Sequence, residues 1–437
     1  SIAAMLTIIE VLDLFIMLEM YKYVSILCIM TTAAILALAT GLPCVVTTHS
    51  GFPDQVKQGF NGFLSKENDH KDFAEKILQY LEEPEKWPEM SKNARKHAFN
   101  YDCKVLSRRQ LEYYKKLSPN VKKIAFIVDC FPTISETWLI NQIVDLIDQG
   151  VDIHIYAFKK NSEEHVSERY FSYNMQDRVT YLEMPQNKVC RFIKAIPKIL
   201  QILFTQPKML RVVFNTKKYG AFASSLKLLF WSEPFLNCDA DLVHCHYGTV
   251  ATKFLPIREI LNLTQPFLTT FYGYDISSIV KSKGVSYYDR LKRECSFFFV
   301  MSNNMKDRVT AIGFPPKKLH VLPISENVES FSYRERTLEE GETVRLTSVG
   351  RFVEKKGFDD LIRALAIVKE KYTKPLVCSI VGGGELEEDL HILARDLDVE
   401  DVVEFKGYMK VQDVNELLLQ SHLYVQASKT AKDGDME

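Results

Sequence analysis

Short, continuously apolar runs alternate along this chain with longer amphipathic stretches. Runs of this kind are typical of strands in a parallel sheet that is buried on both faces, and the amphipathic stretches are typical of its covering helices. A first series of predicted strands occupies residues 122–130, 151–158, 240–248, 266–275 and 295–302, with a helix from about Trp138 to Gln149. The pattern predicts a doubly wound α/β domain.

A second series of apolar runs follows the polar segment 334–342. Its predicted strands are 344–352, 376–386, 402–409 and 422–428, and its predicted helices are 358–372 and 385–397. This series indicates a second Rossmann-like domain that lacks its last elements at residue 437. The missing elements are a helix, one more strand and the closing helices, and residues 30–117 offer all of them.

The beginning of the chain supports two interpretations. The charge-free run from Tyr23 to Pro53 has the length of a membrane span, which would make the chain an integral membrane protein. However, Gly41 and Pro43 break a helix, and the residues CVVTT that follow indicate a buried strand. A secretory signal is not expected, because a basic leading region and a small-residue cleavage site are missing. Residues 1–29 are treated as an apolar leader of unknown origin.

Composition excludes several classes of protein. A length of 437 residues predicts roughly two to three domains. The formal net charge of -1 argues against dedicated nucleic-acid binding. The nine cysteines are scattered without a CxxC pair, which is typical of reduced thiols in a cytosolic protein.

The Phe- and Lys-rich stretch from Val189 to Phe235 is predicted to be helical. One interpretation is an amphipathic surface that faces a membrane. The other is a set of ordinary helices with solvated lysines.

The segment GRFVEKKG at 350–357 carries the clearest chemistry. It follows a predicted strand and opens a predicted helix, so Arg351 and Lys356 are expected beside the free N–H groups of a helix N-terminus. This arrangement suits a diphosphate, although a basic turn of this kind is also common as a solvated loop. The same predicted domain contains VGGGEL at 381–386 and the acidic turn TAKDGDME at 430–437.

Together these motifs resemble the retaining glycosyltransferases of family 4, in the branch that makes colanic acid and exopolysaccharides. The segments KIAFIVDCFPTISETWLINQI, TTFYGYDIS, YYDRL, GRFVEKKG and TAKDGDME occur here in the order that this branch shows. The resemblance implies the GT-B fold, which is an α/β architecture of two facing Rossmann-like domains with parallel sheets.

The resemblance also implies a reaction. A sugar would pass with retention from a nucleotide-sugar donor, UDP- or GDP-linked, to a polysaccharide or lipid-linked acceptor. It implies no metal and no cofactor besides the donor, and a cytoplasmic protein that acts at the inner face of the membrane.

Individual roles follow from the same resemblance. Arg351 and Lys356 would neutralise the donor diphosphate, and Glu437 would contact the sugar hydroxyls. The remaining implied residues are the donor-binding glycines Gly350, Gly357, Gly383 and Gly384, and the acceptor-side residues Ser135, Glu136, Thr137, His246, Tyr272 and Asp275.

Two of these assignments have structural alternatives. Ser135 or Thr133 is also a good N-cap for the helix that follows, with Glu136 favouring its dipole. His244 and His246 lie on one strand face and suggest a metal pair, but two ligands are too few for a metal site, and the end of a strand explains them better.

The order of the segments departs from the family. Residues 30–117 match the carboxyl-terminal part of the donor domain, residues 118–315 the amino-terminal acceptor-side domain, and residues 316–437 the first part of the donor domain. A circular permutation, the middle of a tandem pair and an artefact of sequence assembly each explain this order.

At three places the sequence departs from the family's pattern. These departures favour an alternative interpretation, in which the chain is a catalytically impaired remnant that binds sugar or membrane. The family's second donor carboxylate is either deleted here or replaced by Leu36. Tyr272 replaces a histidine, and a tyrosine is a poor proton acceptor near neutral pH. The segment LPISEN at 322–327 replaces a loop that usually reads HHSGID.

Overall fold

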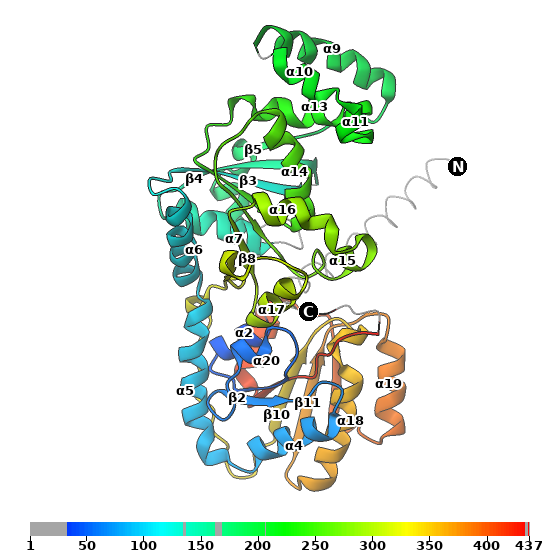
Figure 1. Cartoon of the computed structure of the whole chain (residues 1–437). Coiled ribbons are helices and arrows are strands. Elements are labelled where there is room, and N and C mark those ends of the chain that lie inside the picture. The colour runs from blue at the N-terminus through cyan, green and yellow to red at the C-terminus, as the bar shows by residue number, and fades with distance from the viewer. Residues whose placement is uncertain (1–32, 134–136, 162–167, 206, 433–435, 437) are drawn as a thin grey trace, which may run out of the picture. The chain divides into compact units, whose positions relative to one another are not determined.

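The structure is a computed structural model that describes residues 33–133, 137–161, 168–205, 207–432 and 436. The chain divides into two compact units, each built around its own sheet (Figure 1). Among the described residues, unit 1 comprises 33–106, 302–305, 323–432 and 436, and unit 2 comprises those of 107–301 and 306–322.

Unit 1 contains a six-stranded parallel sheet in the order β12-β11-β10-β13-β1-β2. Its strands are β1 (Cys44–Thr47), β2 (Gly62–Ser65), β10 (Val344–Val349), β11 (Leu376–Val381), β12 (Val403–Gly407) and β13 (Leu423–Gln426). When β10, β11, β12, β13, β1 and β2 are numbered 1 to 6, this order is the Rossmann order 3-2-1-4-5-6. Cys44 lies opposite Tyr424 across the β1–β13 pair. The early segment of the chain therefore completes the sheet that begins at Val344.

Helices cover both faces of this sheet. They are α2 (Ala33–Ala39), α3 (Phe52–Gln55), α4 (His70–Leu81), α5 (Trp87–Ala98), α18 (Phe358–Lys371), α19 (Glu387–Asp396) and α20 (Val411–Gln420). Because side chains alternate along a strand, Val45 packs with α4 and α18, whereas Val46 packs with α2 and α20. Both layers are buried, as the continuous apolar runs predict.

Unit 2 contains a seven-stranded parallel sheet in the order β5-β4-β3-β6-β7-β8-β9. Its strands are β3 (Lys123–Phe131), β4 (Asp152–Lys160), β5 (Val179–Tyr181), β6 (Leu242–His246), β7 (Phe267–Thr270), β8 (Phe297–Val300) and β9 (Leu319–Val321). This is again the order 3-2-1-4-5-6, with β9 added at the edge. The predicted α/β class with two Rossmann-like parallel sheets is confirmed.

The helices of unit 2 alternate with its strands. They are α7 (Thr137–Ile147), α8 (Glu168–Ser172), α9 (Lys188–Thr205), α10 (Pro207–Val213), α11 (Thr216–Tyr219), α12 (Ala221–Ser224), α13 (Lys227–Ser232), α14 (Gly248–Ile260), α15 (Ser278–Lys283), α16 (Asp289–Glu294) and most of α17 (Asn303–Ala311). The stretch from Val189 to Phe235 is mostly helical where it is described, as predicted.

The division between the units falls inside α6 (Cys103–Leu117), after Leu106, rather than after residue 117. The second half of α6 groups with unit 2, and there the Tyr114 hydroxyl forms a hydrogen bond of 2.7 Å with Nδ1 of His244 in β6. The other division follows Leu322, a few residues beyond the predicted position at 315.

The described part of the run from Tyr23 to Pro53 is core rather than membrane span. Its residues form α2 and β1, and the side chains of both elements and of the turn that joins them are buried. The buried-strand interpretation of CVVTT is therefore confirmed, and the leader 1–29 lies outside the described residues. In the described part of the chain, we find no helix with both the length and the apolar character needed to cross a bilayer.

Candidate functional site

The predicted site residues that the structure describes lie at or after the carboxyl ends of strands in each unit. Open parallel sheets bind ligands at this edge, where the strand order reverses. The reversal lies between β10 and β13 in unit 1 and between β3 and β6 in unit 2. The segment 350–357 follows β10, and the segment 381–386 follows the neighbouring strand β11.

The two turns after β10 and β11 are joined through their backbones. Gly350 N donates to the Val381 carbonyl at 3.0 Å, and Phe352 N donates to the Gly383 carbonyl at 2.9 Å. A Cβ on Gly383 would lie 2.7 Å from the Tyr408 ring, so this position accepts no larger side chain without movement. Gly384 lies next to it in the same turn. The predicted glycines Gly350, Gly383 and Gly384 are thus brought together.

Gly357 joins the basic turn to the loop after β13. It precedes α18 with a φ of +65°, which favours glycine. A Cβ there would lie 1.9 Å from the Ala427 carbonyl oxygen, a separation that excludes any side chain. Gln426 also donates from Nε2 to the Lys356 carbonyl at 3.1 Å. The N-terminus of α18, the basic turn and the loop after β13 therefore form one packed edge.

Arg351 and Lys356 differ in environment within this edge. The Arg351 side chain is exposed, whereas Lys356 is buried and belongs to the short 3-10 helix η9 (Glu354–Lys356). The Lys356 stem approaches Gly350, because its Cδ lies 3.2 Å from the position of a Cβ on that glycine. Both cations thus belong to a turn that leads into a helix N-terminus, which is a favourable setting for an anion.

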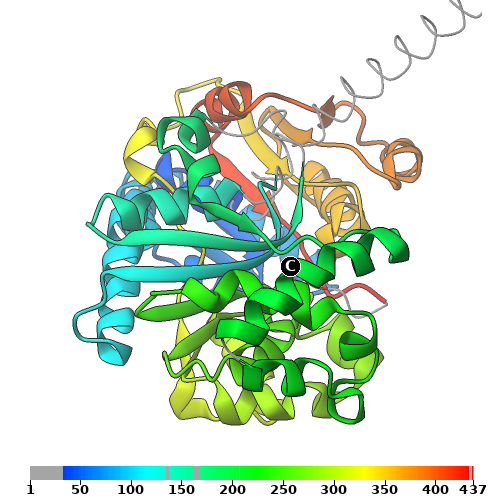
Figure 2. The ribbon, with the colours of Figure 1, turned by 90° about the horizontal axis from the view of Figure 1, so that it is seen from above.

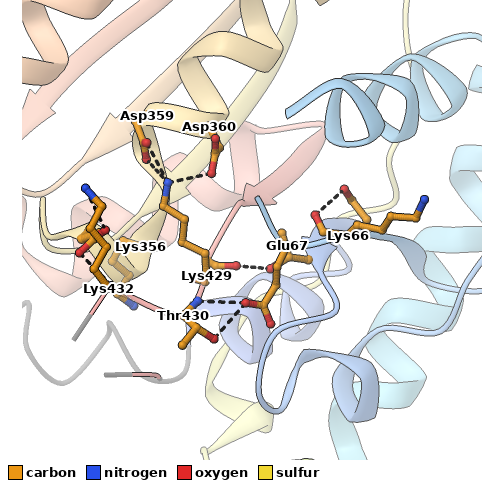
Figure 3. Close-up of polar contacts among 12 residues, drawn as sticks. Lys66, Glu67, Lys356, Asp359, Asp360, Lys429, Thr430 and Lys432 are labelled. Carbon is orange, nitrogen blue, oxygen red and sulfur yellow. Dashed lines mark hydrogen bonds and ion pairs between the residues drawn. The ribbon is translucent and has the colours of Figure 1, made fainter. Parts of the chain in front are cut away.

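A buried lysine that sequence analysis did not identify neutralises the first turn of α18. Lys429 Nζ contacts both carboxylate oxygens of Asp359 and one of Asp360, each at 2.8 Å (Figure 3). Burial opposes the positive charge, but the two carboxylates outweigh it and raise the Lys429 pKa above its ordinary value. Without this lysine, the two acidic side chains would repel an anion at the same helix N-terminus.

A second missed contact fixes the next residue of the loop. Thr430 donates from N and Oγ1 to Glu67 Oε2 at 3.0 and 3.1 Å (Figure 3). Glu67 Oε1 in turn lies 3.1 Å from Nδ1 of the buried His49. Glu67 follows β2 and Thr430 follows β13, so their proximity depends on the complete sheet. No local sequence pattern could have predicted it.

Replacing Lys429 by Met should lower the free energy of unfolding by about 1–3 kcal/mol, because Asp360 is left partly buried without its cation. The measurement is chemical denaturation near neutral pH. Lys432→Met is the matched control, since the Lys432 side chain is exposed and stands 4.0 Å from Glu354. The control should change stability by less than about 0.5 kcal/mol. Equal effects of the two substitutions would contradict this role.

The two donor carboxylates of the family have different outcomes here. Glu437 lies outside the described residues. Leu36 is buried in α2, which contains no acidic residue, and packs in the core beside Val46. At Leu36, α2 therefore contributes a buried apolar side chain and no carboxylate.

In unit 2, two histidines at the end of β6 are stacked and buried. The His244 and His246 rings lie 4.2 Å apart. Both ring nitrogens of His244 have partners, with Tyr114 at 2.7 Å and Thr270 Oγ1 at 2.6 Å. These contacts explain His244 as a structural side chain. Burial lowers the pKa of His246 to about 3, so its imidazole is neutral at physiological pH.

His246 has one nitrogen aimed at a partner and one left open. Its Nδ1 lies 2.7 Å from the Tyr272 hydroxyl, whereas its buried Nε2 has no hydrogen-bond partner among the described residues. An unsatisfied buried polar atom costs about 1–3 kcal/mol. A bound ligand with a hydroxyl or an oxyanion would satisfy it.

Aromatic side chains surround the His246–Tyr272 pair. Measured between ring centroids, Trp138 lies 4.5 Å and Tyr247 lies 4.7 Å from Tyr272. Tyr247 has a φ of +75°, a strained value for a non-glycine residue. Strain of this kind is concentrated at functional sites.

Asp275 holds the turn after β7 to the start of α14. Its Oδ2 accepts from Gly248 N at 2.9 Å, and its Oδ1 accepts from Tyr272 N and Gly273 N at 3.2 Å. Burial raises the Asp275 pKa to about 6, and these N–H groups oppose that rise. With both oxygens engaged by backbone, Asp275 positions Tyr272.

The loop after β3 is only partly described. Ser135 and Glu136 lie outside the described residues, and Thr137 is the first residue of α7. The Thr133 hydroxyl donates to the Cys130 carbonyl at 3.1 Å and so stabilises the turn after β3.

Comparison with known proteins identifies a matching family for part of the chain. The sequence profile of the family described as Glycosyl transferases group 1 matches residues 19–97 and 330–434. These two segments supply all six strands of the unit 1 sheet. The match therefore combines both parts of the chain that fold together.

Similar proteins cover both units. The amylovoran biosynthesis glycosyltransferase AmsK of Erwinia amylovora is 29% identical over 329 residues, which is 72% of this chain and 77% of that protein. The putative colanic acid biosynthesis glycosyltransferase WcaL of Salmonella typhimurium is 28% identical over 321 residues, with the same coverage. The solved apo form of the lipopolysaccharide outer core galactosyltransferase WaaB aligns at 14% identity and a TM-score of 0.47, over 70% of this chain and 74% of its own. Residues 19–97 and 330–434 thus match the group 1 glycosyl transferase profile, and the chain is similar over most of its length to glycosyltransferases named for amylovoran and colanic acid biosynthesis.

Proposed function

We propose that this chain transfers a sugar from a nucleoside-diphosphate sugar, UDP- or GDP-linked, to a glycan or lipid-linked acceptor, with retention. The observation that carries the proposal is the packed edge of unit 1, where the basic turn 350–357 leads into α18 beside a glycine-rich turn. AmsK and WcaL are named for the biosynthesis of polysaccharides, which favours a glycan acceptor.

Electrostatics at this edge favours the departure of a nucleoside diphosphate. Arg351 and Lys356 supply positive charge, and the N-terminus of α18 supplies free N–H groups. Lys429 cancels the charge of Asp359 and Asp360 that would otherwise oppose the anion. Stabilising the charge that develops on the leaving group lowers the barrier to transfer.

The proposed step needs no protein nucleophile. The bond between the anomeric carbon and the phosphate oxygen breaks, and a bond from the acceptor hydroxyl oxygen to the same carbon forms on the same face. The acceptor proton passes to the departing phosphate oxygen, so atoms and charge balance. Glu437 is proposed to contact the sugar hydroxyls. No cofactor is expected besides the donor, which is consumed as a substrate.

The acceptor side is proposed for unit 2. His246 Nε2 and the Tyr272 hydroxyl are the polar groups at the end of β6 and after β7, surrounded by aromatic rings. Aromatic faces with a few directed polar groups are typical of sugar-sized ligand sites. Ser135, Glu136 and Thr137 are proposed to contribute from the loop after β3. The proposed place of action is the cytoplasm at the inner face of the membrane, because one acceptor class is lipid-linked.

A sugar-binding protein without transferase activity is the second candidate. Leu36, in place of a carboxylate, is the observation that favours it, since the buried side chain offers no acceptor to a ribose or a sugar hydroxyl. Tyr272 has the same implication for proton transfer.

Calorimetric titration with UDP and GDP tests the proposal, with uridine and guanosine as controls that lack phosphate. Transferase and remnant both predict binding of one nucleoside diphosphate and little binding of the nucleosides. Release of labelled sugar from UDP- or GDP-sugars, with polysaccharide present, then separates the two. Binding of neither nucleotide would reject both candidates.

A further inference from the structure

Helix α9 of unit 2 exposes an apolar stripe along its whole length. The stripe has the helical spacing i, i+3, i+4, i+7 that places side chains on one face. Its two phenylalanines are strongly exposed, with exposed fractions of 63% for Phe192 and 83% for Phe204. We call the apolar stripe the α9 face, and it consists of Val189, Phe192, Ile193, Ile196, Leu200, Leu203 and Phe204.

The α9 face is not the side that anchors the helix. Ala195 and Ile202 are buried in a cluster with Met209 of α10 and Leu229 of α13. Figure 1 shows α9 as the outermost helix of this group, with α10, α11 and α13 between it and α14, and the same helices lie toward the viewer in Figure 2. Monomeric proteins rarely expose so many large apolar side chains next to one another unless that surface binds a partner or a membrane.

The segment around α9 is strongly basic. Residues 188–232 contain nine Lys and Arg and no Asp or Glu, while the whole chain has a net charge of -1. Lys198 and Lys218 are paired with Glu233 and Glu259 from outside this segment. In contrast, the exposed Lys188, Lys194 and Lys217 have no carboxylate partner among the described residues.

We propose that the α9 face docks on the surface of an anionic lipid bilayer. An amphipathic helix with aromatic and aliphatic side chains on one face and lysines beside it lies in the bilayer interface, and anionic headgroups attract the lysines. Protein interfaces, in contrast, are depleted in lysine. Charge complementarity thus favours lipid over a protein partner. This inference goes beyond sugar transfer and needs neither donor nor acceptor.

Flotation with phosphatidylcholine vesicles, with and without phosphatidylglycerol, tests the proposal. Wild-type chain should bind the vesicles that contain phosphatidylglycerol and lose binding as salt is raised. Phe192→Ser with Phe204→Ser should weaken the partition coefficient at least about tenfold, because two large apolar side chains no longer insert. Ile392→Ser, at an exposed isoleucine of α19, is the matched control and should bind as wild type.

The charge contribution has its own pair of variants. Lys188→Glu with Lys194→Glu should weaken binding at least about tenfold, since each lysine near an anionic surface contributes about a factor of five. Lys371→Glu with Lys374→Glu, two exposed lysines of unit 1, should leave binding unchanged.

Three results would overturn the proposal. The first is failure of wild-type chain to bind either kind of vesicle. The second is equal binding of the Phe192/Phe204 variant and wild type. The third is a concentration-dependent dimer that disappears in the Phe192/Phe204 variant, which would show that a second copy covers the α9 face. Circular dichroism and the affinity for UDP or GDP, measured on each variant, distinguish loss of docking from loss of folding or of the proposed function.

Discussion

Replacing both Arg351 and Lys356 by Ala is expected to weaken the binding of UDP or GDP about 100-fold. Each cation makes a charge-assisted contact to phosphate that contributes about 1.5–3 kcal/mol, and the exposed position of Arg351 places its share at the lower end. The N-terminus of α18 remains in the variant, so weak binding should persist. Calorimetry of the wild type and the double variant gives the ratio of dissociation constants.

Two controls keep this result interpretable. Lys371→Ala removes a charge from the opposite end of α18 and should leave the affinity unchanged. Lys356 is buried, so a melting curve of Lys356→Met shows separately whether the basic turn still folds. An unchanged affinity in the double variant would mean that the diphosphate, if bound, does not bind at this edge.

Acidification should destabilise the chain through His246. Burial holds the His246 pKa at about 3, whereas an unfolded histidine titrates near its ordinary 6.5. Below that value the unfolded state binds a proton that the folded state excludes, so stability falls as the pH falls from 6.5 toward 3. Between pH 7 and pH 4 the loss amounts to about 3 kcal/mol. His246→Gln should remove this part of the pH dependence.

Urea denaturation at a series of pH values measures the effect, with Asp275→Asn as a control of opposite sign. The Asp275 pKa is raised to about 6 in the folded chain, so the folded state binds its proton more tightly than the unfolded state between pH 4 and 6. Asp275 therefore contributes stability at low pH that is lost as the pH rises through 6. Its replacement should steepen the acid loss. Parallel curves for wild type and His246→Gln would contradict the buried, neutral histidine.

Most of the fold could be predicted from the sequence because parallel strands buried on both faces have continuous apolar runs. The strands at 44–47, 344–349 and 423–426 follow such runs. In contrast, β2, β5 and β9 are edge strands of three or four residues. Each of these segments contains a polar residue and is too short for apolar continuity or period-two patterning to identify it.

The candidate site divides in a similar way. The basic and glycine-rich turns are contiguous in sequence and therefore visible as motifs. The Lys429–Asp359 pair joins residues 70 positions apart, and the Thr430–Glu67 contact joins residues 363 positions apart. Such contacts depend on which strands become neighbours in the sheet. No local sequence pattern predicts which strands pair when they lie so far apart along the chain. His246 was identifiable as a strand-end residue, but its open Nε2 required the structure.

The pairing of β1 with β13 has a consequence for how the chain folds as it is synthesised. The Thr47 hydroxyl donates to the Ser428 carbonyl, 381 positions along the chain. Until β13 emerges from the ribosome, β1 and β2 form a two-stranded piece with an open edge, which is not stable in water. Unit 2, made from an almost continuous stretch, is free to fold in the meantime. Unit 1 thus has a high contact order, and its early segment is expected to be the part of the chain most prone to aggregation during synthesis.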